Sequence, residues 1–171
     1  MTRNFILAAG LAAAVALSIT AAQAQSADKA SQKFMTNAME GDYAEIDVGK
    51  LAQEKGTTQA VKDFGAKLVA DHGQSLGTAK QVASQMGVKD PGGASVGEKA
   101  EYLKLKVMSG KTFDRTFAKD MVSDHQQTIK DFQQQAAKTG PAADFAKQTL
   151  PTLQDHLQIA QSLTRETTGS K

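Results

Sequence analysis

The stretches FGAKLVADH (64–72) and FAKDMVSDH (117–125) both fit the pattern F-x-x-x-[LM]-V-x-D-H. Phe, Val and an Asp-His pair therefore recur at the same offsets in two separate parts of the chain. A third pair is Asp155-His156, so each of the three histidines directly follows an aspartate. Apolar residues recur with a helical period around all three pairs, which indicates that the pairs lie on helices.

The residues between 26 and 165 show the patterns of helices rather than strands. Alternation with period two is absent, β-branched residues are sparse, and Ala, Lys, Gln, Leu and Glu dominate. Gly, Pro and capping residues divide this part of the chain into four main helices, with a short extra helix before the third. The short connections predict an all-α fold, an antiparallel four-helix bundle. We expect the first helix to begin near Asp28 and the third main helix to begin after Thr112.

The N-terminus has the pattern of a secretory signal peptide. Arg3 precedes an apolar run (5–22), and Ala22-Gln23-Ala24 supplies the small residues of a cleavage site. Cleavage after Ala24 would release a mature domain (25–171) into the periplasm, with no further segment apolar enough to span a membrane. The alternative is that the apolar run remains as a membrane anchor.

The composition narrows the chemistry that the chain can perform. The net charge of the whole chain is only +2, which gives no argument for binding nucleic acid. The absence of Cys excludes disulfides and thiolate ligands, so any metal must be bound through His, carboxylate or water. Partners and oligomeric state are not indicated by the sequence.

Each main helix is expected to direct one ionisable group toward the core. At about 100° per residue, Glu45, His72, His125 and His156 fall on or near the apolar stripes of their helices. Counted from the turns, the four positions lie at heights that agree to within roughly 7 Å. The sequence therefore predicts a polar layer of one carboxylate and three imidazoles. This ligand set suits one divalent transition metal, either Zn, Fe, Mn or Cu.

Four aspartates are expected to act as outer partners of this layer. Asp71 and Asp124 lie on the flanks of their helices, where each can accept a ring N–H from a histidine of the next helix. Asp155 faces away from the apolar stripe. Asp114 faces the core about 16 Å along the axis from His125, and its favoured role is an interaction with the N-terminal dipole of its helix.

A metal-free interpretation of the same residues is also open. Glu45, Asp71 and Asp124 could satisfy the three histidines through hydrogen bonds alone. The layer would then be a polar network that fixes the register of the helices.

Four phrases of the sequence resemble a bacterial family of exported proteins, the "domain of unknown function 4142" family. The phrases are GDYAEIDVGKLA (41–52), VKDFGAKLVADH (61–72), SGKTFDRTFAKDMVSDH (109–125) and LPTLQDHLQIA (150–160). The resemblance implies a signal peptide and an all-α, ferritin-like fold. It also implies motif positions at Glu45, Asp71, His72, Phe113, Asp114, Asp124, His125, Pro151 and His156.

The chain departs from related patterns in two ways. Phe117 stands where the family usually shows Tyr, so no phenol is offered there. Di-iron bundles use Glu-x-x-His pairs, whereas the residues three before the histidines are Val69, Val122 and Leu153. Ferroxidase activity is therefore not expected from the fold alone.

Three hypotheses on function follow from these patterns. The favoured one is a non-enzymatic, stress-related periplasmic bundle whose buried Glu/His/Asp cluster binds one transition metal. The second is a metal-dependent oxidoreductase or peroxide-handling protein that uses the same cluster. The third is a metal-free structural or interaction module. The sequence assigns no catalytic residue and no substrate.

Overall fold

The computed structural model describes residues 12–169, and its regular structure is entirely helical in this range. The helices are α1 (Ala12–Lys55), α2 (Gln59–Gln85), α3 (Val96–Lys106), α4 (Gly110–Ala136) and α5 (Pro141–Thr168). The prediction of an all-α fold with a short helix before the third long one is confirmed for this part of the chain. The predicted signal peptide falls on residues 1–24, of which 1–11 lie outside the described residues.

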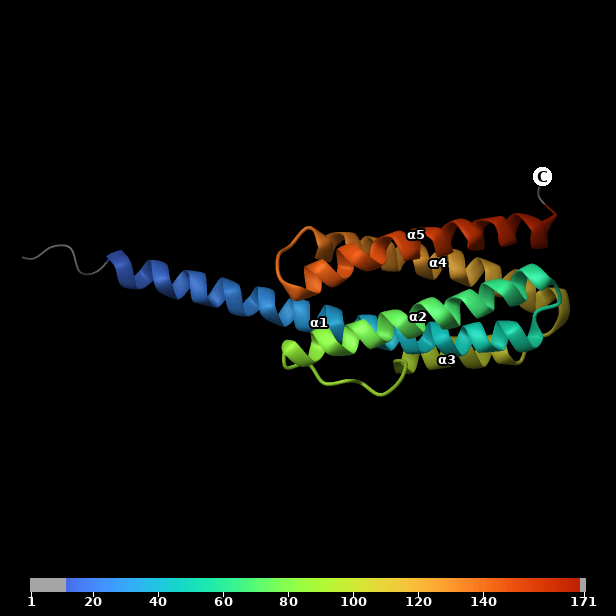
Figure 1. Cartoon of the computed structure of the whole chain (residues 1–171), viewed down its shortest axis with the longest axis horizontal. Helices are drawn as coiled ribbons and strands as arrows, with labels where there is room; N and C mark the ends of the chain where they lie inside the picture. Colours follow the sequence, from blue (N-terminus) through green and yellow to red (C-terminus); the bar gives the residue numbers. More distant parts are fainter. Residues whose placement is uncertain (1–11, 170–171) are drawn as a thin grey trace, which may run out of the picture.

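The four long helices pack as two pairs. α1 lies along α2, α4 lies along α5, and the contact of α2 with α5 joins the pairs, while the short α3 runs beside α1 (Figure 1). Two separate apolar clusters fill the interior. One contains Met39 and Phe132, and the other contains Phe64 and Phe117. None of the histidines belongs to either cluster, and the ring of His156 touches Phe64 with centroids 5.9 Å apart.

Several helix boundaries follow the local sequence. Ser95 and Glu98 form the predicted capping box at the start of α3, and α5 begins at Pro141 after Gly140, whose φ is 97°. A positive φ of this size is readily adopted only by glycine.

Two predicted boundaries were wrong. α1 begins at Ala12 rather than near Asp28, because the intervening residues are rich in Ala and contain no Gly or Pro that would end a helix. α4 begins at Gly110 with Ser109 as its N-cap, so Thr112 already lies inside the helix.

The earlier start of α4 changes the position of Asp114. Its carboxylate is 2% exposed and accepts hydrogen bonds from the backbone N–H of Thr57, at 3.0 Å, and from the Thr57 hydroxyl. Asp114 therefore lies beyond the first turn of α4 and holds the turn between α1 and α2. It does not contact the histidines, in contrast to the role as an outer partner that the sequence suggested.

We expect Asp114→Ala to lower the free energy of unfolding by about 1–3 kcal/mol, because the substitution removes a buried carboxylate and the hydrogen bonds that it accepts from Thr57. Urea unfolding followed by circular dichroism would measure the change. Asp131→Ala, an exposed site on the same helix, is the matched control and should stay within about 0.5 kcal/mol of the parent protein. Equal decreases in the free energy of unfolding of the two variants would show that the hydrogen bonds to Thr57 do not stabilise the fold.

Two glycines allow α1 and α2 to approach closely. A Cβ atom added at Gly49 would lie 2.7 Å from the carbonyl oxygen of Gly65, and one added at Gly65 would lie 2.6 Å from that of Gly49. These neighbours are backbone atoms, which cannot rotate away as the end of a side chain can. The pairing of the two helices at this point therefore depends on the absence of side chains.

Gly65→Ala should destabilise the fold by about 1–3 kcal/mol through overpacking. Gly77→Ala is the matched control on the same helix, because nothing lies within 4 Å of a Cβ added there. Alanine should stabilise that exposed helical position by about 0.5–1 kcal/mol. A lower melting temperature for Gly65→Ala and a higher one for Gly77→Ala would support the close contact. A higher melting temperature for Gly65→Ala would refute it.

Candidate metal centre

Three histidines from three different helices meet in the interior. His72 of α2, His125 of α4 and His156 of α5 are 6%, 1% and 0% exposed. One ring nitrogen of each lies within 4.8 Å of those of the other two. The predicted meeting of these histidines is therefore confirmed. Whether they bind a metal depends on which nitrogens carry protons.

The hydrogen bonds of His125 fix its tautomer. Its Nδ1 lies 3.0 Å from the carbonyl oxygen of Met121, which can only accept, so Nδ1 carries the proton. Burial lowers the pKa of His125, and the neighbouring His72 and His156 lower it further, to about 3. The ring is neutral, and its Nε2 presents a lone pair.

The tautomer of His156 is fixed in the same way. Its Nε2 lies 2.8 Å from a carboxylate oxygen of Asp71 and donates to it, as the sequence predicted for an aspartate on a neighbouring helix. Burial raises the pKa of Asp71, but the bonds from His156 and Lys67 outweigh it and lower the pKa. Burial lowers the pKa of His156 more than Asp71 raises it. Its Nδ1 then also presents a lone pair.

His72 is held by a residue that the sequence analysis missed. Its Nδ1 lies 2.8 Å from a carboxylate oxygen of Asp42 on α1, and both side chains are 7% exposed. Burial lowers the pKa of His72, but Asp42 and Glu45 outweigh it and raise the pKa. The other nitrogen, Nε2, is buried with no hydrogen-bond partner.

A sequence signal for Asp42 did exist. Asp42 lies three residues before Glu45 and thus one turn earlier on nearly the same face of its helix. The pairing with His72 spans 30 residues and two helices, so spacing alone could not identify it.

Three ring nitrogens remain after these bonds are counted, namely Nε2 of His72, Nε2 of His125 and Nδ1 of His156. The last two face each other at 3.3 Å, although neither has a proton to share when both rings are neutral. Each opposite nitrogen is anchored by a carboxylate or a carbonyl, which is the usual arrangement behind metal-bound imidazoles.

Glu45 lies beside this group but outside it. One of its carboxylate oxygens is 3.8 Å from Nδ1 of His125, and the other is buried without a hydrogen-bond partner. Burial raises the pKa of Glu45 to about 7, against the opposing effect of His72, and Asp124 and Asp42 add to the rise. The structure thus brings Glu45 to the predicted layer, next to the nitrogen of His125 that is already bonded to Met121.

The remaining two aspartates contact other groups. Burial raises the pKa of Asp124, and the nearby carboxylates of Glu101 and Asp120 raise it further, to about 6. Asp155 is 53% exposed and pairs with Lys67 at 3.1 Å. In the described residues neither aspartate bonds to a histidine, because Asp124 faces α3 and Asp155 faces outward.

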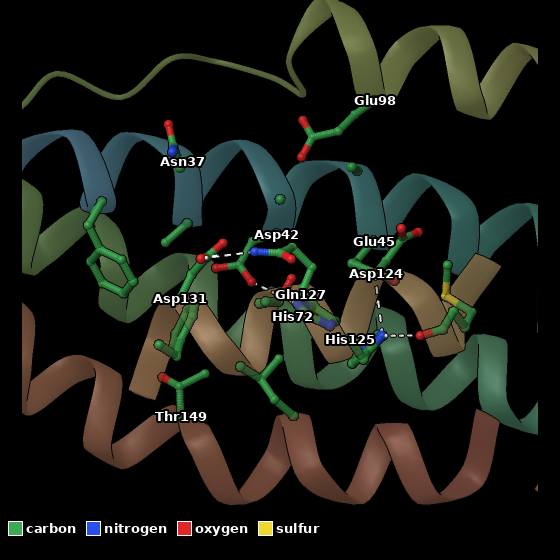
Figure 2. Close-up of a pocket in the computed structure, with 18 of the residues that line it drawn as sticks. Asn37, Asp42, Glu45, His72, Glu98, Asp124, His125, Gln127, Asp131 and Thr149 are labelled. Atoms are coloured by element: carbon green, nitrogen blue, oxygen red, sulfur yellow. Dashed lines mark hydrogen bonds and ion pairs between the residues drawn. The ribbon is translucent and has the colours of Figure 1, made fainter. Parts of the chain in front are cut away.

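A cavity of about 460 Å³ reaches the centre from outside. It lies mainly between α1, α3 and α4, and its lining includes His72 and His125 but not His156. Figure 2 shows Asp42, His72 and His125 together on its inner wall.

Comparison with known proteins places the chain in a family. The family described as "Domain of unknown function (DUF4142)" matches residues 16–163. The chain belongs to this family. A comparison of the DUF4142 chain with curated proteins finds no match.

A solved structure resembles the fold of this DUF4142 protein. It is the crystal structure of a DUF305 fragment from Deinococcus radiodurans, with a TM-score of 0.71 and 12% sequence identity. The match covers 80% of this chain and 96% of that one. At this identity the similarity concerns the fold alone.

Asp42→Ala should destabilise the metal-free protein by about 1–3 kcal/mol, because it leaves both nitrogens of the buried His72 without a partner. Asp47→Ala is the matched control on the same helix, since Asp47 is exposed and pairs only with Lys50 at 3.6 Å. Urea unfolding in the presence of a chelator would measure both. Similar midpoints for the two variants would show that Asp42 does not support His72.

Proposed function

We propose that this protein is an exported four-helix bundle of the ferritin-like type that binds one divalent transition-metal ion. His72, His125 and His156 would be the protein ligands, and removal of the signal peptide after Ala24 would release the domain into the periplasm. The family membership supports the first part of the proposal, an exported helical bundle. The three buried histidines support the second part, the binding of a metal ion.

The observation that carries the proposal is the convergence of three ring nitrogens from three buried histidines, all within 4.8 Å of one another. Two lone pairs that face each other at 3.3 Å repel, and the unpaired Nε2 of the buried His72 adds the cost of a lost hydrogen bond. A divalent cation among the three nitrogens would remove both penalties, since neutral imidazole is a good ligand for Zn, Cu and Fe.

The size of the group is compatible with this role. Metal–nitrogen bonds of about 2.1 Å in a tetrahedral site separate the ligand nitrogens by roughly 3.4 Å. The three nitrogens lie within 4.8 Å of one another, so they would need to move together by about an ångström or less. Changes of side-chain torsion angle can supply such a shift.

Three protein ligands leave a fourth position open, as in catalytic rather than structural zinc sites. A metal-dependent oxidoreductase or peroxide-handling protein is therefore the second candidate, favoured by the cavity that reaches His72 and His125. A spectroscopic change when peroxide is added to the iron- or copper-loaded protein would support this candidate over simple metal binding.

We expect the protein purified from the periplasm to carry about one metal ion per chain. Adding Zn²⁺ to the metal-free protein should raise its free energy of unfolding by about 2.7 kcal/mol at a free concentration of 100 times Kd. His72→Ala and His125→Ala should lose both the bound metal and this stabilisation.

Asp144→Asn, an exposed site on α5, is the control and should keep both. Elemental analysis and thermal unfolding would make the measurements. If the parent protein binds none of Zn²⁺, Cu²⁺, Fe²⁺ and Mn²⁺, the histidines form a metal-free polar layer and the proposal is wrong.

A further inference from the structure

The cavity that reaches the histidines is strongly acidic. Its lining contains seven carboxylates and two lysines, a balance of −5 when all are ionised. The whole chain has a net charge of +2, so the negative charge is concentrated on this one surface. The carboxylates come from three helices: Asp42 and Glu45 from α1, Glu98 and Glu101 from α3, and Asp120, Asp124 and Asp131 from α4.

Five of these carboxylates form the outer part of the cavity, from Glu98 and Glu101 on α3 to Asp120, Asp124 and Asp131 on α4. Among the described residues, none of the five lies in an ion pair with a lysine or arginine. Their hydrogen bonds are few. Glu98 accepts from the N–H of Ser95, and Asp131 accepts from Gln127.

The inner end of the cavity holds a second, independent feature. The side chain of His72 is 93% buried, being 7% exposed, and its Nε2 has no hydrogen-bond partner. The free oxygen of Glu45 is buried beside it. Figure 2 shows Glu98 projecting from α3 toward α1 above these groups. Carboxylates therefore line the cavity from its outer part to the unpartnered Nε2 of His72.

The other side of the histidine group is covered by a positive charge. Lys67 pairs with Asp71 at 3.0 Å and with Asp155 at 3.1 Å, directly outside the bond between Asp71 and His156. The cavity lining includes none of the residues on this side, which are Lys67, Asp71, Asp155 and His156. A cation approaching from this side would meet Lys67, whereas one approaching between α1, α3 and α4 would meet a lining in which the carboxylates outnumber the lysines by seven to two.

The geometry points to the acidic cavity as the loading path by which a hydrated divalent cation reaches His72, His125 and His156. This inference rests on the proposed metal binding and adds a route and a driving force to it. The outer carboxylates attract the cation from solution and raise its concentration at the opening, since clefts lined by one sign of charge focus the field. The histidines then replace water molecules in its coordination sphere.

The test is the association rate of Co²⁺ with the full metal-free chain, measured by stopped-flow competition with a chromophoric indicator. The double variant Glu101→Gln/Asp131→Asn removes two exposed carboxylates from the cavity without altering a histidine or its hydrogen-bond partners. We expect its association rate constant at low ionic strength to fall about 3- to 10-fold, with an unchanged dissociation rate constant.

The matched control is Glu54→Gln/Glu166→Gln, which removes the same charge from two exposed positions outside the cavity. Its association rate constant should stay within about twofold of the parent value. Added salt should slow association to the parent protein and affect the cavity variant less, because ions screen the attraction.

The possible outcomes separate the path from the site. Equal association rate constants for the parent and the cavity variant, or equal losses in the cavity and control variants, would overturn the path while leaving metal binding intact. Failure of the parent protein to bind Co²⁺ at equilibrium would overturn both. A slower cavity variant with a normal control would support the path.

Discussion

The central constraint on this fold is the need of three buried imidazoles for hydrogen-bond partners. A polar nitrogen without a partner in the interior costs on the order of 1–3 kcal/mol, so the surrounding helices must supply acceptors. Asp42 comes from α1, Asp71 from α2 and the carbonyl oxygen of Met121 from α4. The polar layer thereby connects all four long helices, and one nitrogen of each ring is left free for a ligand.

The close contact of α1 with α2 serves this layer. Gly49 and Gly65 let the two backbones touch, about one turn from Glu45 and two turns from His72. Because adjacent turns of a helix move together, the short distance at the glycines favours a close approach of the two helices at Asp42 and His72 as well. The close glycine contact and the 2.8 Å hydrogen bond between Asp42 and His72 thus lie in the same interface of α1 with α2.

The sequence predicted the parts of the site that depend on helical periodicity. His72, His125 and His156 fall on apolar stripes, and periodicity alone places them in the core. Asp42 was missed, and Asp114 was expected to interact with the N-terminus of its helix, because the contacts of both depend on which side chains meet across different helices. Asp114 also shows how a boundary error propagates: a start of α4 at Gly110 rather than after Thr112 moves this residue out of the first turn.

The balance of charges around the histidines bears on why a metal would be favoured over a proton. Protonation of one imidazole would relieve the repulsion across the 3.3 Å contact, yet burial holds the pKa of both His125 and His156 below the ordinary value. Asp42 and Asp71 each stabilise positive charge on the ring they contact. A divalent cation would bind all three rings, and the carboxylates of Asp42 and Asp71 would both stabilise its charge. A proton, in contrast, would be shared by at most two of the rings, those of His125 and His156. Because Asp42 and Asp71 favour positive charge while burial disfavours protonation of His125 and His156, a cation shared by the three rings is the better occupant of the layer.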